Sequence, residues 1–109
     1  MIGEPKAMQH VTLLDGGMGQ ELFLRSNKPA SPLFSAQAML DEPEMVIQLH
    51  CDFISAGADL ICINSYAATP ERLARDADIS VFPKIQKAAV RAALIARDNS
   101  QKPVRIAGC

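Results

Sequence analysis

Short apolar runs alternate along this chain with longer stretches in which apolar residues recur every three or four positions. The short runs are rich in valine, leucine and isoleucine, which is typical of buried parallel strands. The longer stretches have the period of an amphipathic helix. The pattern predicts strands over 11–14, 59–63 and 104–107, and helices over 18–25, 35–40, 41–56, a short stretch from 70, and 81–98.

Strands that alternate with helices through short links indicate an α/β fold. Such a sequence is expected to form right-handed βαβ units around about three parallel strands. Two local signals mark the third helix. Asp41 is predicted to cap its start, because an aspartate can accept hydrogen bonds from the unpaired N–H groups of the first turn. Gly57 is predicted to end the helix.

Alternation of side chains along a strand gives a checkable expectation for the first two strands. If Asp15 and Asn64 point to one face of the sheet, Leu13 and Cys62 share that face. The residues expected to pack on the opposite face, against helices, are Leu14, Ile61 and Ile63.

The first candidate site is Asp15-Gly16-Gly17, which lies between a predicted strand and a predicted helix. α/β proteins build their sites at the carboxyl ends of strands. The glycines let backbone N–H groups approach a ligand, and a helix start adds donors that suit a carboxylate. A carboxylate beside such a backbone suits an amino acid, whose ammonium and carboxylate need opposite partners. The alternative is an ordinary turn in which Asp15 caps the next helix.

A second polar group follows the second predicted strand. Asn64, Ser65 and Tyr66 would share an edge of the sheet with Asp15 and could orient a substrate there. The alternative is that Asn64 and Ser65 only satisfy backbone groups in a turn.

Composition and charge exclude several classes of function. The chain has 49% hydrophobic and 21% charged residues, as in ordinary globular proteins, and a net charge of -1. That charge gives no reason to expect nucleic acid or an anionic membrane as a partner. No apolar run approaches the roughly 20 residues that span a bilayer. Residues 1–9 lack the pattern of a secretion signal and are expected to form a flexible leader.

Cysteine and histidine add no local metal motif. Cys51, Cys62 and Cys109 are odd in number and widely spaced, which fits free thiols in a reducing cytoplasm. Cys62 is expected to line the sheet without a catalytic role. His50 is adjacent to Cys51 on a predicted helix, where neighbours do not share a ligand. We expect His50 to make a local hydrogen bond.

Taken together, six blocks of the sequence resemble the homocysteine S-methyltransferase family. Their order and spacing are similar to the amino-terminal part of that domain, and the resemblance covers residues 10–109. The blocks are His-Val-Thr-Leu-Leu-Asp-Gly-Gly-Met-Gly-Gln-Glu-Leu at 10–22, Pro-Leu-Phe-Ser-Ala at 32–36, Asp-Glu-Pro-Glu at 41–44, His-Cys-Asp-Phe at 50–53, Ala-Gly-Ala-Asp at 56–59 and Asn-Ser-Tyr-Ala-Ala-Thr-Pro at 64–70.

The resemblance implies a fold and a set of roles. The fold would be the amino-terminal portion of a (β/α)₈ barrel of the TIM type. Asp15 would help bind the ammonium of homocysteine, and the Gly16–Gly17 backbone its carboxylate. Phe34 lies in a segment that resembles one lining the methyl-donor side of the pocket, although ordinary core packing is the alternative. Ile63 and Ser65 depart from the threonine-rich form of their segment in many relatives.

The family's chemistry depends on residues that this sequence does not contain. The resemblance implies zinc held by three cysteine thiolates from two later segments, so no metal ligand and no catalytic residue is expected in this chain. A barrel needs about 250 residues, and the chain has 109. We therefore expect the amino-terminal piece of a larger domain, or a truncated product. The methyl donor would be S-methylmethionine or S-adenosylmethionine.

Two other classes of function stay open at this stage. One is a non-catalytic fragment that buries its open sheet edges by self-association. The other is an unrelated βα module that uses the glycine turn to bind phosphate.

Overall fold

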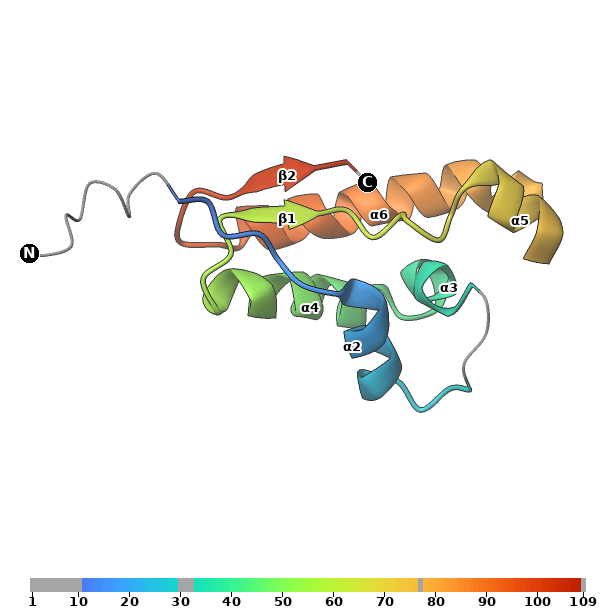
Figure 1. Cartoon of the computed structure of the whole chain (residues 1–109), viewed down its shortest axis with the longest axis horizontal. Helices are drawn as coiled ribbons and strands as arrows, with labels where there is room; N and C mark the ends of the chain where they lie inside the picture. The colour runs from blue at the N-terminus through green and yellow to red at the C-terminus, as the bar shows by residue number, and fades with distance from the viewer. Residues whose placement is uncertain (1–10, 30–32, 77, 109) are drawn as a thin grey trace, which may run out of the picture.

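The computed structural model describes residues 11–29, 33–76 and 78–108, and its helices and strands alternate as an α/β chain (Figure 1). The elements in chain order are α2 (Met18–Arg25), α3 (Phe34–Asp41), α4 (Pro43–Ser55), β1 (Leu60–Cys62), α5 (Pro70–Asp76), the 3₁₀ helix η1 (Ile79–Val81), α6 (Phe82–Asp98) and β2 (Arg105–Ala107).

The described strands β1 and β2 form a parallel pair. Ile61 lies opposite Ile106, and the arrows in Figure 1 run in the same direction. The connection between them carries α5, η1 and α6, so the predicted βαβ unit and α/β class are confirmed. Of the three predicted strands, the structure forms the second and third.

The predicted first strand, 11–14, is reduced to a single parallel bridge between Leu14 and Leu60. The ladder stops there because the N–H groups of Asp59 and Leu60 both donate to the same carbonyl of Leu13, at 2.7 and 3.3 Å. The N–H of Leu13 donates to the Asp59 carboxylate instead of to a backbone carbonyl. The segment is therefore extended and bonded beside β1 without forming a regular strand.

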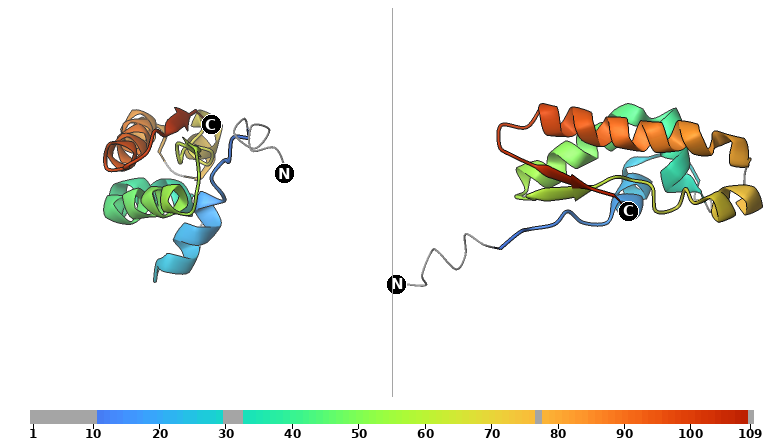
Figure 2. Two further views of the ribbon diagram at one scale, coloured as in Figure 1. Left: turned by 90° about the vertical axis from the view of Figure 1, so that its left-hand side faces the viewer. Right: turned by 90° about the horizontal axis from the view of Figure 1, so that it is seen from above.

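Helices α4 and α6 lie side by side against the strands (Figure 2). Ile61 is fully buried beneath them, as predicted, and Ile63 is packed against the same core. Leu14 is 57% exposed and belongs to neither core cluster, so its predicted burial against a helix is wrong. The helices cover β1 but leave the bridging segment at its edge exposed.

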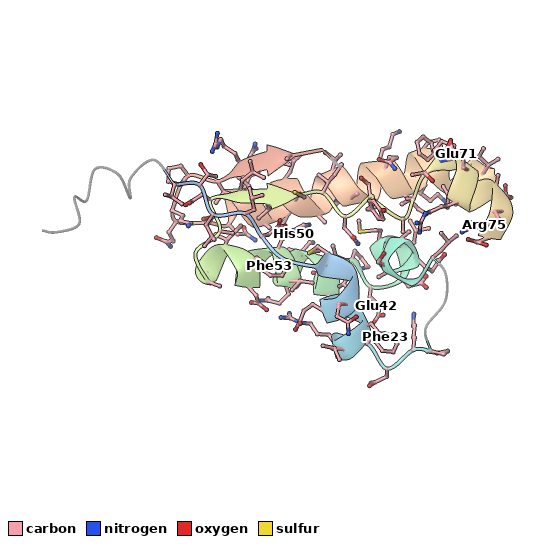
Figure 3. The ribbon with its side chains drawn as sticks, in the orientation of Figure 1. Phe23, Glu42, His50, Phe53, Glu71 and Arg75 are labelled. Atoms are coloured by element: carbon pink, nitrogen blue, oxygen red, sulfur yellow. The ribbon has the colours of Figure 1, made fainter. Side chains whose placement is uncertain are left out.

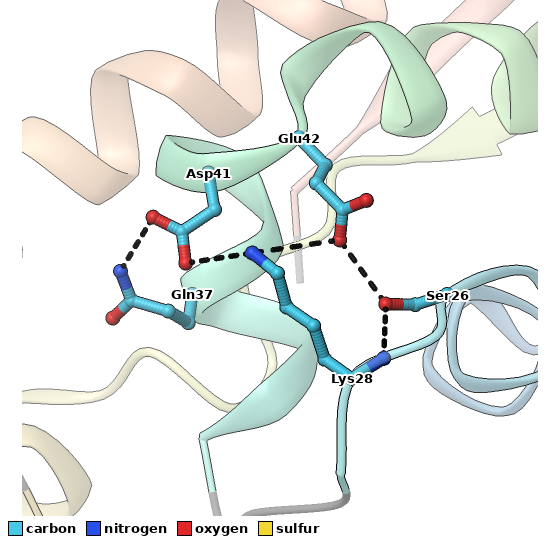
Figure 4. A network of polar contacts seen from close by, with 5 residues as sticks. All are labelled: Ser26, Lys28, Gln37, Asp41 and Glu42. Carbon is cyan, nitrogen blue, oxygen red and sulfur yellow. Dashed lines mark hydrogen bonds and ion pairs between the residues drawn. The ribbon is translucent and has the colours of Figure 1, made fainter.

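The junction between α3 and α4 differs from the sequence prediction. Asp41 is the last residue of α3, and the N-cap of α4 is Glu42, which makes no side-chain capping bond. Pro43 fills the first helical position, where its missing N–H costs nothing. The Asp41 carboxylate accepts hydrogen bonds from Lys28 and Gln37, in a network that joins α3 to the loop after α2 (Figure 4).

Two other predicted helix boundaries are confirmed. Gly57 follows the C-cap Ala56 and has a φ of +121°. Residues other than glycine rarely adopt this conformation. The hydroxyl of Thr69 accepts a hydrogen bond from the N–H of Arg72 at the start of α5. Within the described ranges no helix has the length and apolar character needed to cross a bilayer.

Candidate functional site

A cleft of about 300 Å³ lies where the bridging segment and β1 end. Four of the predicted binding residues, Asp15, Gly16, Asn64 and Tyr66, share its lining. The other lining residues are Met18, Gly19, Ser35, Cys62 and Ile63. Gly17 and Ser65 are chain neighbours of lining residues without lining the cleft themselves. Phe34 begins α3, and its side chain lies outside the described part of the structure.

Asp15 is half-buried and bonded to β1 through two groups. Its backbone N–H donates to the carbonyl of Leu60 at 3.1 Å, and its carboxylate Oδ2 accepts from the N–H of Cys62 at 3.0 Å. Its Oδ1 has no hydrogen-bond partner among the described residues. Asp15 does not cap α2, since the N-cap is Gly17. One carboxylate oxygen in the cleft is thus available to a ligand's donor.

Gly16 and Gly17 differ in what surrounds them. A Cβ on Gly16 would lie 2.9 Å from Cε1 of Phe53, so the close approach of this ring requires glycine. A Cβ on Gly17 would meet nothing within 4 Å. Gly17 is the N-cap of α2 and supplies no side-chain hydrogen bond to the first turn. The helix N-terminus therefore presents backbone N–H groups and a partial positive charge beside the Asp15 carboxylate.

Asn64 and Ser65 are buried, with 7% and 6% of their surface exposed. The Asn64 amide nitrogen donates to the carbonyl of Ser35 at 2.9 Å and approaches Sδ of Met39 at 3.5 Å. The Ser65 carbonyl accepts from the N–H of Ala68. Asn64 therefore ties the end of β1 to α3, and its amide oxygen is the group left for a ligand.

Tyr66 stands at the rim of the cleft and is 71% exposed. The guanidinium of Arg72 lies 5.4 Å from the centre of its ring, within the range of a cation–π contact. This contact holds the ring while leaving the phenol exposed.

His50 is the residue whose environment the sequence did not reveal. It is fully buried on α4, one turn before Phe53 (Figure 3), and neither ring nitrogen has a hydrogen-bond partner among the described residues. The predicted local hydrogen bond is therefore wrong for the part of the chain that the structure describes. Burial lowers the pKa of His50, and the negative charge of Asp15 opposes that shift.

Met18, Gly19 and Ser35 also line the cleft, although the sequence did not indicate this. Gly19 lies close to α3, since a Cβ on it would be 3.6 Å from Cβ of Ser35. The position of Ser35 depends on the packing of α3, for which the sequence holds no local signal.

The described residues do not form a metal site. No three histidine, cysteine or acidic side chains gather among them. Cys62 lines the cleft, whereas Cys51 lines a separate one of about 410 Å³ near the ends of α4 and α6. Burial, and then the charge of Asp52, raise the pKa of the Cys51 thiol. This favours the protonated form, which is a poor metal ligand.

Comparisons with known proteins agree on one family. The family model described as homocysteine S-methyltransferase matches residues 12–109. Homocysteine S-methyltransferase 1 of Arabidopsis thaliana is 32% identical over 88 residues, which are 80% of this chain and 27% of that protein. Homocysteine S-methyltransferase of Escherichia coli (strain K12) is 40% identical over 62 residues, which are 57% of this chain and 20% of that protein.

Solved structures give the same result. The metallated form of the homocysteine methyltransferase MmuM from Escherichia coli matches with a TM-score of 0.76 and 31% identity, over 96% of this chain and 39% of that one. The oxidized form of the same protein matches with the same TM-score and 33% identity, over 90% of this chain and 36% of that one. The chain thus spans about a fifth to two-fifths of the length of these relatives.

Proposed function

Because this chain belongs to the homocysteine S-methyltransferase family, we propose that it supplies the amino-acid-binding part of an enzyme that methylates homocysteine. The product of methyl transfer to the homocysteine sulfur would be methionine. One observation carries the proposal: Asp15, whose Oδ1 has no hydrogen-bond partner among the described residues, lines the same cleft as the backbone leading into α2. The site thus offers a negative and a positive group at close quarters, as an amino acid requires.

Each end of the amino acid has a complementary group in the cleft. The ammonium would donate to Asp15, whose position is fixed by its bond to Cys62. The carboxylate would accept from N–H groups at Gly16–Gly17, supported by the positive end of α2. Asn64 and Tyr66 would orient the side chain from the opposite wall, with Phe34 and Ser65 in the segments that flank it. Charge-assisted bonds at both ends would select a zwitterion.

The larger architecture is part of the same proposal. We infer that the chain forms the first part of a (β/α)₈ barrel, since its described strands are parallel and the cleft lies at the carboxyl end of β1. A metal is supported by the metallated form of the Escherichia coli relative. The described residues do not fit a zinc site, so the proposed zinc would be held by cysteines elsewhere in the protein. S-methylmethionine and S-adenosylmethionine are the proposed methyl donors.

A second candidate is a self-associating βα fragment without catalytic activity. Its support is the apolar surface of the bridging segment, where Val11, Leu13 and Leu14 are 63%, 52% and 57% exposed. Exposed apolar residues beside a short parallel pair favour covering by further protein. Either the rest of a barrel or a second copy would provide that cover.

The two candidates are distinguished by the protein isolated from its natural cell. We would measure its intact mass, its zinc content, and methionine formation from homocysteine and each donor. A mass well above 11.8 kDa, with about one zinc per chain and methyl transfer, supports the enzyme. A mass matching these residues, with no zinc and no transfer, supports the fragment.

A further inference from the structure

A second apolar groove, of about 420 Å³, lies between α3, α4 and α6 and shares no lining residue with the candidate site. Its floor is formed by side chains that are buried or half-buried, among them Met39 and Leu40 of α3, Ile47 of α4, and Ala88, Ala92 and Ile95 of α6. One wall carries three exposed cations of α6, Lys84, Lys87 and Arg91. Of the described residues that line the groove, Glu44 alone is acidic.

Within the described ranges, these three cations differ from the other basic residues in their lack of polar partners. Among the described residues, each remaining lysine or arginine contacts a carboxylate, a hydroxyl or an aromatic ring. Lys84, Lys87 and Arg91 take part in no ion pair or hydrogen bond there. The chain as a whole has a net charge of -1, so this unpaired positive row is a local feature of the groove.

The spacing of the row indicates the shape of its counterpart. Lys84, Lys87 and Arg91 recur at i, i+3 and i+7, so they line one side of α6 over about 10 Å of its axis. A single small anion could not meet all three. Ala88, Ala92 and Ile95 form a parallel apolar row at i, i+4 and i+7. A helix with an apolar stripe flanked by acidic residues has the matching spacing.

We propose that this groove binds an acidic amphipathic helix of a partner protein. Its apolar stripe packs between α4 and α6, and its carboxylates pair with Lys84, Lys87 and Arg91. Anionic membranes are usually recognised by clusters of four to eight basic residues, more than this wall carries. Single-stranded nucleic acid is bound by aromatic side chains on which bases stack, and this groove has no aromatic lining residue.

The test is a binding titration with the protein made from its complete coding sequence. The probe is a fluorescent helical peptide of about 18 residues, with leucines at i, i+4, i+7 and i+11 flanked by glutamates. A second peptide has lysines in place of the glutamates, and a third has serines in place of the leucines. Vesicles of phosphatidylserine and phosphatidylcholine test the membrane alternative. The variant is Lys84→Glu/Lys87→Glu/Arg91→Glu, which avoids Met39 because that residue also contacts Asn64.

A matched control carries the same change in charge away from the groove, as Arg75→Glu/Arg97→Glu/Arg105→Glu. The natural protein and this control should bind the glutamate–leucine peptide with affinities within about twofold of each other. The groove variant should bind it at least roughly tenfold more weakly and should gain affinity for the lysine peptide. Equal binding by both variants, undiminished binding of the serine peptide, preference for vesicles, or no binding by the natural protein would overturn the proposal. Circular dichroism verifies that each variant is folded.

Discussion

The carboxylate of Asp15 accepts a hydrogen bond from the backbone N–H of Cys62 at 3.0 Å, across 47 positions of the sequence. This bond joins the segment before α2 to the end of β1, and so holds the two walls of the candidate cleft together. Asp15 therefore has a structural role as well as the proposed binding role. The two roles use different oxygens, which makes them separable by substitution.

Asp15→Ala should lower the free energy of unfolding by about 1–3 kcal/mol, because the part-buried N–H of Cys62 loses a charged acceptor. Asp15→Asn keeps an oxygen at the same place and should stay within about 1 kcal/mol of the natural protein. Urea unfolding of both variants measures the difference. If Asn and Ala destabilise equally, the side-chain oxygen is not what holds β1.

Gly16→Ala should destabilise by about 1–3 kcal/mol, because the new methyl group would lie 2.9 Å from the ring of Phe53. The ring packs against both core clusters and has little room to move. A double-mutant cycle with Phe53→Leu checks the cause: the alanine should cost less once the ring is absent. If Gly16→Ala destabilises the Phe53→Leu protein as much as the natural one, contact with the Phe53 ring is not the cause.

Gly17→Ala should cost at most about 1 kcal/mol, because a Cβ there meets no atom within 4 Å and φ is -74°. Under the proposed function the same change should still weaken homocysteine binding several-fold, since the methyl group would stand beside the N–H groups that receive the carboxylate. Calorimetry of the variant measures this. Unchanged affinity would mean that the ligand does not lie against this side of Gly17, contrary to the proposed placement of the carboxylate.

His50 should make the folded state less stable as the pH falls. Its pKa is lowered in the folded protein by burial, so below about pH 6.5 the unfolded state takes up a proton that the folded state does not. The contribution to stability is complete above pH 6.5 and is lost as the pH falls toward the lower folded-state pKa. Urea unfolding between pH 7.5 and about 5, above the range of ordinary carboxylates, isolates this effect.

His50→Leu provides the comparison. Leucine removes two buried nitrogens that lack partners, so the variant should be as stable as the natural protein or more so at neutral pH. Its stability should change little between pH 7.5 and 5. A variant that is strongly destabilised and keeps the full pH dependence would show that His50 is not the titrating group.

Asn64→Asp should destabilise by about 2–3 kcal/mol, because it removes the donor to the Ser35 carbonyl and places a carboxylate beside that oxygen. Asn27→Asp is the matched control, since Asn27 is exposed and the same change there should stay within about 0.5 kcal/mol. Thermal melts of both variants suffice. Equal effects would mean that the bond from Asn64 to α3 contributes nothing.

Most helices were predictable from the sequence because they have local causes, although the junction of α3 and α4 was predicted wrongly. The apolar period of α6, Gly57 at its positive φ and the hydroxyl of Thr69 act within a few residues of the chain. The sequence predicted a strand at 11–14 and could not show that it would be reduced to one bridge. That outcome depends on the Asp59 carboxylate, which accepts the N–H of Leu13. Apolar composition alone could not show that no helix would cover Leu14.

The candidate site also has some features that local sequence indicated and others that it did not. A glycine pair after an apolar run indicated the turn at Asp15, and the cleft does bring Asp15, Gly16, Asn64 and Tyr66 together. Two features depend on how α3 and α4 pack: the position of Ser35 in the cleft lining, and the lack of described hydrogen-bond partners for the His50 ring. Such long-range contacts leave no periodic signal in the sequence.

Calorimetric titration of L-homocysteine into the protein made from its complete coding sequence, beside its Asp15→Asn variant, tests the binding role of this cleft. Saturable binding by the natural protein is expected. The variant should bind at least about tenfold more weakly, because one charged contact of about 1.4 kcal/mol or more is lost. The zinc content should be the same in both proteins. Equal affinity in the two, or no binding by a folded natural protein, would contradict the assignment of this cleft to homocysteine.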